Sequence, residues 1–105
     1  MEQALLDQQM RSWLYEAAHD VVGLWELCRV AREKGGAKTP DESRKLVLGF
    51  VRDLLTNGVR AVNVADGHPW PDQRPDSVIE RISREWDDLG REPNVPDIVW
   101  FKKTS

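Results

Sequence analysis

The chain has 105 residues, of which 15 are Lys or Arg and 18 are Asp or Glu, so its net charge is -3 at neutral pH. This length fits one domain of about 50–200 residues, and we predict a single domain over residues 1–105. The acidic pI, near 5.3, disfavours a dedicated duplex-binding protein, which would show a basic excess. With 40% hydrophobic and 31% charged residues, the composition also argues against a disordered or membrane-embedded chain.

The chain contains one cysteine, Cys28. A single thiol forms no internal disulfide and does not suffice for a thiolate zinc site, which indicates a reducing compartment. No apolar run approaches the length of about 18 residues needed for a membrane span, and no signal peptide is recognisable. We therefore expect a cytoplasmic protein with no membrane partner.

The first third of the chain has the apolar periodicity of a helix. Apolar residues recur there in steps of three and four: Leu6, Met10, Trp13, Ala17, Val21, Leu24, Cys28 and Ala31. His19, Asp20 and Gly23 interrupt the pattern, and Asp20 could cap a new helix. We predict either one bent helix or two helices, over residues 3–18 and 20–34, ended by Gly35 and Gly36.

A capping box predicts the start of the next helix. The Thr39 hydroxyl can accept the amide of Glu42, the Glu42 carboxylate can reach back to Thr39, and Pro40 fits the first helical position. An apolar stripe follows, and Asn57-Gly58 ends the helix. The stripe consists of Val47, Phe50, Val51, Leu54 and Leu55.

The remaining chain alternates between strand and helix patterns. Residues 59–64 have the β-branched alternation of a strand, and the proline-rich residues 65–75 predict a loop. A further helix should follow Pro75 and end before Gly90, and residues 98–101 should form a strand that pairs with 59–64. The fold class is therefore mainly α (α+β), with three to four helices and a small two- or three-stranded antiparallel sheet. A winged helix is the alternative shape.

No catalytic, metal-binding or cofactor-binding motif is recognisable. Glu16 and His19 lie one helical turn apart, but a carboxylate-bridged metal bundle needs such a pair from each of two helices. His68 is a lone loop histidine, and Cys28 lies on the apolar stripe, where a thiol behaves as a small hydrophobe. We predict no enzyme activity, no cofactor and no small-molecule substrate; a small enzyme would need Glu16, His19 or His68 to be essential.

Acidic residues concentrate between residue 63 and residue 101, where nine acidic groups face four basic ones. Seven lie in stretches with few apolar neighbours: Asp66, Asp72, Asp76, Asp87, Asp88, Glu92 and Asp97. One interpretation is a solvated surface that maintains solubility and caps a helix through Asp72 or Asp76. The other is an acidic face that meets a basic partner.

Trp70 lies between Pro69 and Pro71, outside any apolar stripe. A proline-stiffened aromatic loses little entropy on binding, which is typical of an interface anchor. The alternative is that Trp70 folds back onto its own core. Trp13, Trp86 and Trp100 are predicted core residues, while Trp25 should pack under the 65–75 loop or lie at the surface.

The case for DNA binding depends on the basic residues that follow residue 43, namely Arg44, Lys45, Arg52 and Arg60. The predicted strand after Gly58 could begin a wing. The loop that would form this wing carries Asp66 and Asp72 against Arg74, so phosphates would repel it. Nucleic acid is therefore the less favoured partner.

Three segments resemble a known class of proteins. They are Asp20-Val21-Val22-Gly23-Leu24-Trp25-Glu26-Leu27, then residues 54–59, and then Trp86-x-x-Leu89-Gly90-Arg91-x-Pro93-Asn94-x-x-Asp97-Ile98-Val99-Trp100-Phe101. Together they resemble small bacterial immunity-type proteins of toxin-immunity systems, including contact-dependent growth inhibition. The resemblance spans roughly residues 20–101; the first 19 residues and 36–38 lie outside it. It implies a cytosolic protein that binds and neutralises one cognate toxin, often a nuclease.

The sequence therefore predicts an immunity protein that occludes the active site of a basic toxin domain. The predicted partner-binding residues are Asp66, Trp70, Asp72, Asp76, Asp87, Asp88, Glu92 and Asp97. A winged-helix-like DNA-binding regulator or antitoxin is the alternative.

Overall fold

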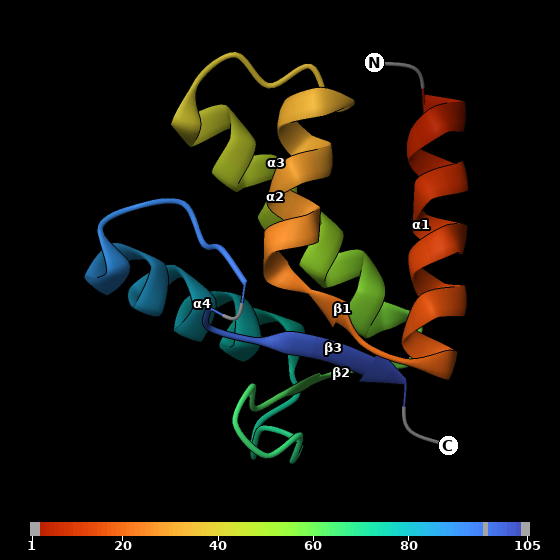
Figure 1. Cartoon of the computed structure of the whole chain (residues 1–105), viewed down its shortest axis with the longest axis vertical. Helices are drawn as coiled ribbons and strands as arrows, with labels where there is room; N and C mark the ends of the chain where they lie inside the picture. The colour runs from red at the N-terminus through yellow and green to blue at the C-terminus, as the bar shows by residue number, and fades with distance from the viewer. Residues whose placement is uncertain (1–2, 96, 104–105) are drawn as a thin grey trace.

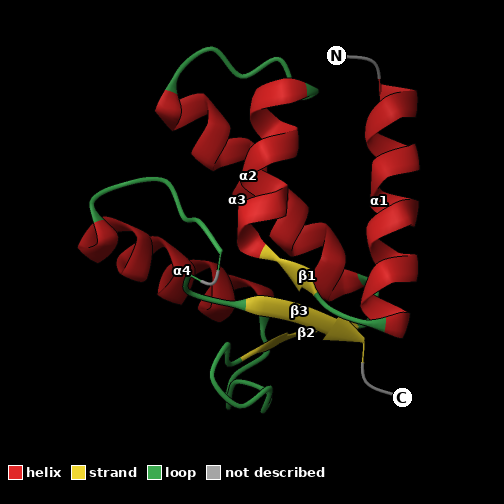
Figure 2. Ribbon diagram, viewed as in Figure 1, coloured by secondary structure: helices red, strands yellow, loops and turns green. Residues whose placement is uncertain are grey.

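The computed structural model describes residues 3–95 and 97–103, which form four helices and three strands (Figures 1 and 2). The elements follow one another as α1 (Gln3–His19), β1 (Val22–Gly23), α2 (Leu24–Glu33), α3 (Pro40–Thr56), β2 (Val59–Val62), α4 (Pro75–Leu89) and β3 (Trp100–Lys103). The strands form an antiparallel sheet in the order β1-β3-β2. This confirms a mainly helical α+β fold with a small sheet.

The segment between the first two helices differs from the prediction. Residues 20–34 do not form one helix, because Val22 and Gly23 pair with Phe101 and Trp100 as strand β1. The helix begins at Leu24 with Gly23 as an extended N-cap, so Asp20 is not the cap. A Cβ atom at residue 23 would lie 2.5 Å from Cδ1 of Trp25, which explains the need for glycine there.

The capping box at the start of α3 is confirmed in one half and corrected in the other. The Thr39 hydroxyl accepts a hydrogen bond from the Glu42 amide at 3.2 Å. The Glu42 carboxylate accepts the Lys38 amide at 2.8 Å instead of reaching Thr39. Two donors at the helix start are still satisfied, but the second is the Lys38 amide, one residue before the predicted Thr39 amide.

Strand β2 ends at Val62, two residues before the predicted end. Asn63 turns the chain away, because its amide donates to the His68 carbonyl at 2.8 Å and its own carbonyl accepts the Gly67 amide. The 63–74 loop then returns along β2. The Gln73 side-chain amide pairs with both backbone groups of Ala61, at 2.9 and 2.8 Å, and so closes the free edge of the sheet.

Helix α4 begins at Pro75 and is ended by left-handed Gly90, as predicted. Strand β3 begins at Trp100, whereas residues 98–101 were predicted. The shift has a local cause: Ile98 adopts a φ of 66°, which no strand residue can have. The predicted pairing of the last strand with β2 is confirmed, with Phe101 opposite Ala61.

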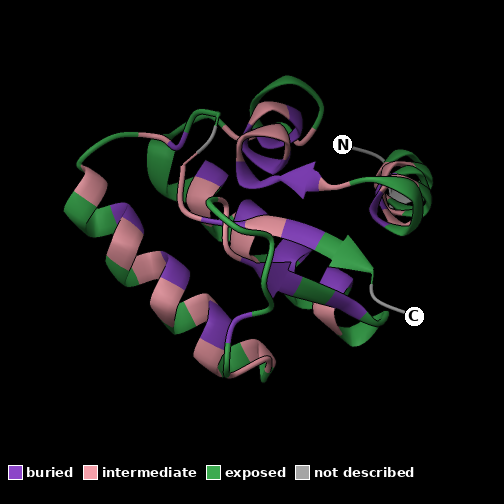
Figure 3. Cartoon of the chain, turned by 60° about the horizontal axis from the view of Figure 1, so that its bottom comes forward, coloured by how far each residue is buried: buried purple, intermediate pink, exposed green. Residues whose placement is uncertain are grey.

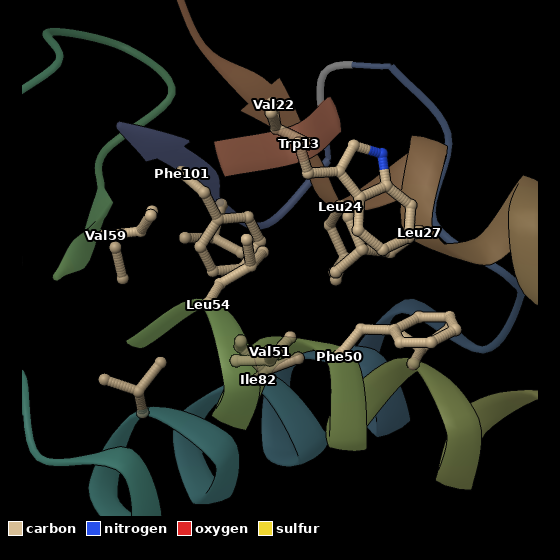
Figure 4. Close-up of a cluster of buried hydrophobic side chains, with 14 of the residues drawn as sticks. Trp13, Val22, Leu24, Leu27, Phe50, Val51, Leu54, Val59, Ile82 and Phe101 are labelled. Carbon is tan, nitrogen blue, oxygen red and sulfur yellow. The ribbon is translucent and has the colours of Figure 1, made fainter. Parts of the chain in front are cut away.

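The core lies where the helices meet the sheet (Figure 4). Trp13 packs against Phe50 with ring centroids 5.1 Å apart, and Phe101 of β3 is fully buried. Figure 3 shows that buried residues lie on the inner sides of the helices, whose outer sides are exposed. Cys28 is buried, as predicted, whereas Trp100 is only half-buried and is not a core residue.

Candidate functional site

Helix α4 separates the predicted partner-binding residues into two groups. Asp66, Trp70, Asp72 and Asp76 precede its second turn. Asp87, Asp88, Glu92 and Asp97 lie at or beyond its last turn. At 1.5 Å per residue, Asp76 and Asp87 are about 16 Å apart along the helix. The structure therefore brings together two clusters rather than one acidic face.

The carboxylates of the first group form hydrogen bonds and ion pairs within the 63–74 loop and at the start of α4. Asp66 accepts the His68 amide at 2.9 Å, and Asp72 accepts both the Arg74 amide and the Arg74 guanidinium. These bonds to Arg74 hold the pKa of Asp72 well below its usual range. Asp76 pairs with Arg52 of α3 at 2.6 Å. Each of these acids has a partner within the protein.

Trp70 is a core residue, so its prediction as a surface anchor is wrong. Its side chain is 3% exposed. Its amide donates to the Ala61 carbonyl at 2.9 Å, and the Arg81 guanidinium covers its ring at 3.7 Å from the centroid. The return of the 63–74 loop along β2 places the indole inside, a long-range effect absent from the local sequence.

The second group surrounds the end of α4 where the chain turns toward β3. Asp87 accepts a hydrogen bond from Arg44 of α3 at 2.7 Å. The same guanidinium donates to the Ser83 carbonyl at 2.7 Å and lies 5.1 Å from the centre of the Trp86 ring. Arg44 therefore holds the last turns of α4 against α3 while Asp87 stays largely exposed.

The segment from residue 91 to residue 98 carries the other two acids. Glu92 pairs with Arg32 of α2 at 3.0 Å. Asp97 accepts the Asn94 amide and the Arg91 guanidinium, each at 2.8 Å, and these bonds lower its pKa. Both carboxylates are thereby fixed in direction.

A strained turn follows Asp97. The Val99 amide donates to the Asp97 carbonyl at 2.8 Å, which closes a three-residue γ-turn around Ile98 with its φ of 66°. Positive φ is unfavourable for a β-branched residue, and this hand of γ-turn is the rarer one. Such strain persists only where surrounding contacts enforce it, and it often accompanies binding sites.

A groove runs beside this cluster, between the start of α3 and the end of α4. It consists of two adjoining hollows of about 280 and 510 Å³. Both are lined by Pro40, Ser43, Arg91 and Glu92. Ser43 is 5% exposed, and its hydroxyl has no hydrogen-bond partner in the described chain. We call this groove and the carboxylates Asp87, Asp88, Glu92 and Asp97 the α4-end site.

The α4-end site has a mixed charge. Arg44, Arg32 and Arg91 neutralise three of its carboxylates, and Asp88 is exposed with no pairing cation among residues 3–95 and 97–103. The sequence located the acids but not these arginines; two of the pairs, Arg44 with Asp87 and Arg32 with Glu92, form between segments far apart in the chain. A rim of oriented charges around a partly apolar groove is the usual anatomy of a protein-binding surface.

The candidate catalytic residues have ordinary surroundings. Burial, first among several causes, raises the pKa of Glu16, and His19 Nδ1 bonds the Tyr15 carbonyl at 2.9 Å while its ring stacks on that tyrosine. Burial raises the pKa of Cys28 to about 12, far above that of a reactive thiol. Within the described residues, no three His, Cys, Asp or Glu side chains gather where they could hold a metal ion.

The basic residues considered for DNA binding do not form one surface. Arg44 and Arg52 both point to α4, where Asp87 and Asp76 pair with them. Helix α4 therefore covers the side of α3 that carries its two arginines. Lys45 is exposed on α3, and Arg60 is exposed on the sheet.

No family model, curated protein or solved structure matches this chain. No helix in the described part of the chain is long and apolar enough to cross a membrane.

Proposed function

We propose that this chain is an immunity-type protein that binds one cognate toxin domain in the cytoplasm and occludes its active site. The observation that carries the proposal is the α4-end site. Asp87 and Glu92 line its groove, Asp88 follows Asp87 at the end of α4, and Asp97 directly precedes the strained turn at Ile98. The resemblance of residues 20–27, 54–59 and 86–101 to immunity-type proteins supports the same function.

The proposed mechanism is steric and electrostatic. A nuclease channel must be positively charged to hold phosphates, so a small protein with oriented carboxylates can block it. Arg32, Arg44 and Arg91 fix three carboxylates before binding, which lowers the entropy lost on association. Asp88 is free to pair with a cation of the partner.

Specificity follows from the arrangement of these charges and not from net charge. A surface that was only negative would attract any basic protein. The alternation of carboxylates and arginines around the groove accepts a partner whose charges match the pattern and repels others.

The experiment begins with capture of the partner by the tagged chain from its own cells. The captured domain is then expressed in a naive host with and without the chain, and its nuclease activity is measured on both preparations. The proposal predicts one basic domain that stops growth alone and is inactive in the complex. A captured domain whose activity is unchanged by the chain would contradict it.

A DNA-binding regulator or antitoxin is the second candidate, because one observation favours it. The order α1-β1-α2-α3-β2-β3, with strands arranged β1-β3-β2, resembles that of a winged helix. Here residues 63–99, including α4, replace the short wing between the last two strands. A salt-dependent shift of duplex DNA by the purified chain would support this function, and no shift at low salt would remove it.

A further inference from the structure

The side of the sheet turned away from the core carries two tryptophans and two cations. Trp100 and Lys102 alternate with buried Phe101 along β3, and Arg60 of β2 lies directly opposite Lys102. Trp25 extends over Gly23, which pairs with Trp100. We call Trp25, Arg60, Trp100 and Lys102 the outer sheet face. No helix crosses in front of β2 and β3 in Figure 3, where this side faces the viewer.

The two cations lack the counter-charge that the protein supplies to most of its arginines. Seven arginines pair with carboxylates: Arg29, Arg32, Arg44, Arg52, Arg74, Arg81 and Arg91. Arg60 and Lys102 are exposed and have no such partner among residues 3–95 and 97–103. Like charges directly opposite each other destabilise a strand pair, so this arrangement favours an anionic ligand.

Trp100 lies on the same face of the sheet as the two cations, and Trp25 lies beside Gly23, the residue that pairs with Trp100. A Cβ atom at residue 23 would be 2.5 Å from Trp25 Cδ1 and 3.5 Å from Trp100 Cδ1, so both indoles lie close to this glycine. Both side chains are half-buried rather than enclosed. Lys102 is two residues beyond Trp100 on the same face, a distance of about 7 Å along the strand.

We propose that the outer sheet face binds single-stranded nucleic acid. Phosphates would pair with Arg60 and Lys102, and bases would stack on the indoles of Trp25 and Trp100, which is the usual combination in proteins that bind single strands. A duplex is less suitable because the arginines of α3 already pair with α4. An acidic peptide would use the cations but leave the indoles without a role.

The test uses Arg60→Glu, which separates binding from folding. A glutamate at this position faces Lys102 as an opposite charge, so the variant should resist urea at least as well as the wild type. Binding of a fluorescein-labelled oligothymidylate of about a dozen nucleotides, followed by anisotropy at low salt, should weaken by about tenfold or more. Arg84→Glu is the matched control, because Arg84 is also exposed and unpaired within the described chain; its affinity should stay within about twofold of the wild-type value.

Three results would overturn the proposal. One is no binding of the oligonucleotide by the wild-type chain at low salt, and another is equal affinity for wild type and Arg60→Glu. The third is a pair of observations: polyglutamate of equal charge displaces the oligonucleotide, and neither ligand changes the tryptophan emission when it binds. Together they would assign the face to an acidic protein partner. Emission quenched by the oligonucleotide, and less quenched in Trp100→Phe, is the expected result.

Discussion

Arg44 of α3 donates to Asp87 of α4 at 2.7 Å, so a contact between residues 43 apart in the chain joins the two helices. A second pair, Arg52 with Asp76, repeats the contact near the other end of α4, so the helices run antiparallel. Both arginines that α3 would need to contact DNA therefore pair with carboxylates of α4 instead. The same contact fixes one carboxylate of the α4-end site.

The two residues of the first pair should differ in their effect on stability. Arg44→Ala removes the bonds to Asp87 and Ser83 and the contact with Trp86, and should lower the free energy of unfolding by about 1–3 kcal/mol. Asp87→Ala leaves the last two contacts in place, and its exposed carboxylate should cost less than about 1 kcal/mol. Urea denaturation of both variants measures the difference. Equal losses would show that the ion pair alone holds α4.

The capping interaction at the start of α3 is measurable. Thr39→Ala removes the acceptor for the Glu42 amide and should lower the free energy of unfolding by about 1 kcal/mol. Thr39→Ser keeps the hydroxyl and should stay within about 0.5 kcal/mol of the wild type. Thermal unfolding of the three proteins checks this order; a serine variant as unstable as the alanine variant would argue against the cap.

The strained turn at Ile98 predicts a reversal of the usual order of alanine and glycine. Both Ile98→Ala and Ile98→Gly lose the partly buried side chain, but glycine adopts a positive φ without penalty. Ile98→Gly should therefore be more stable than Ile98→Ala by about 1 kcal/mol. Chemical denaturation gives the sign directly, and a less stable glycine variant would mean that residue 98 does not hold a positive φ in solution.

The lowered pKa of Asp97 predicts an acid-dependent loss of stability. A carboxyl whose pKa is lower in the folded state stabilises the protein above its unfolded pKa, near 4, and loses that contribution as the pH falls through its folded pKa. Asp97→Asn lacks this contribution at every pH. The stability gap between wild type and variant should be largest above pH 5 and should shrink below about pH 4, as measured by urea titrations across this range. If the difference in stability between wild type and variant did not change with pH, the ionised Asp97 carboxylate would not be its cause.

The sequence predicts those helix ends that are set by residues at the end itself. The Thr39-Pro40 cap, Asn57-Gly58, Pro75 and left-handed Gly90 all start or end helices where expected, because their effects are local. The sequence does not predict strand β1, because a strand of only two residues, Val22 and Gly23, gives too weak a β-propensity signal. Gly23 of this strand lies close to the Trp25 side chain, and this contact has no signature in the sequence.

The candidate site was predictable only in part. The sequence locates the acidic residues after residue 63, but the arginines that pair with Asp76, Asp87 and Glu92 come from α2 and α3, and such long-range pairs leave no periodic signal. The burial of Trp70 depends on the return of the 63–74 loop along β2. The prolines on either side of Trp70, Pro69 and Pro71, do not indicate in which direction that loop turns.

The central claim is that the toxin domain meets the α4-end site. Its most direct test is the association rate of the captured domain with two matched variants at low salt. Asp87→Lys with Asp88→Lys alters one paired and one unpaired acid at this end of α4, and Asp76→Lys with Glu80→Lys makes the same charge change at the other end. The account predicts association slowed by about tenfold or more for the first variant and by under about threefold for the second. Equal rates for the two variants would contradict it.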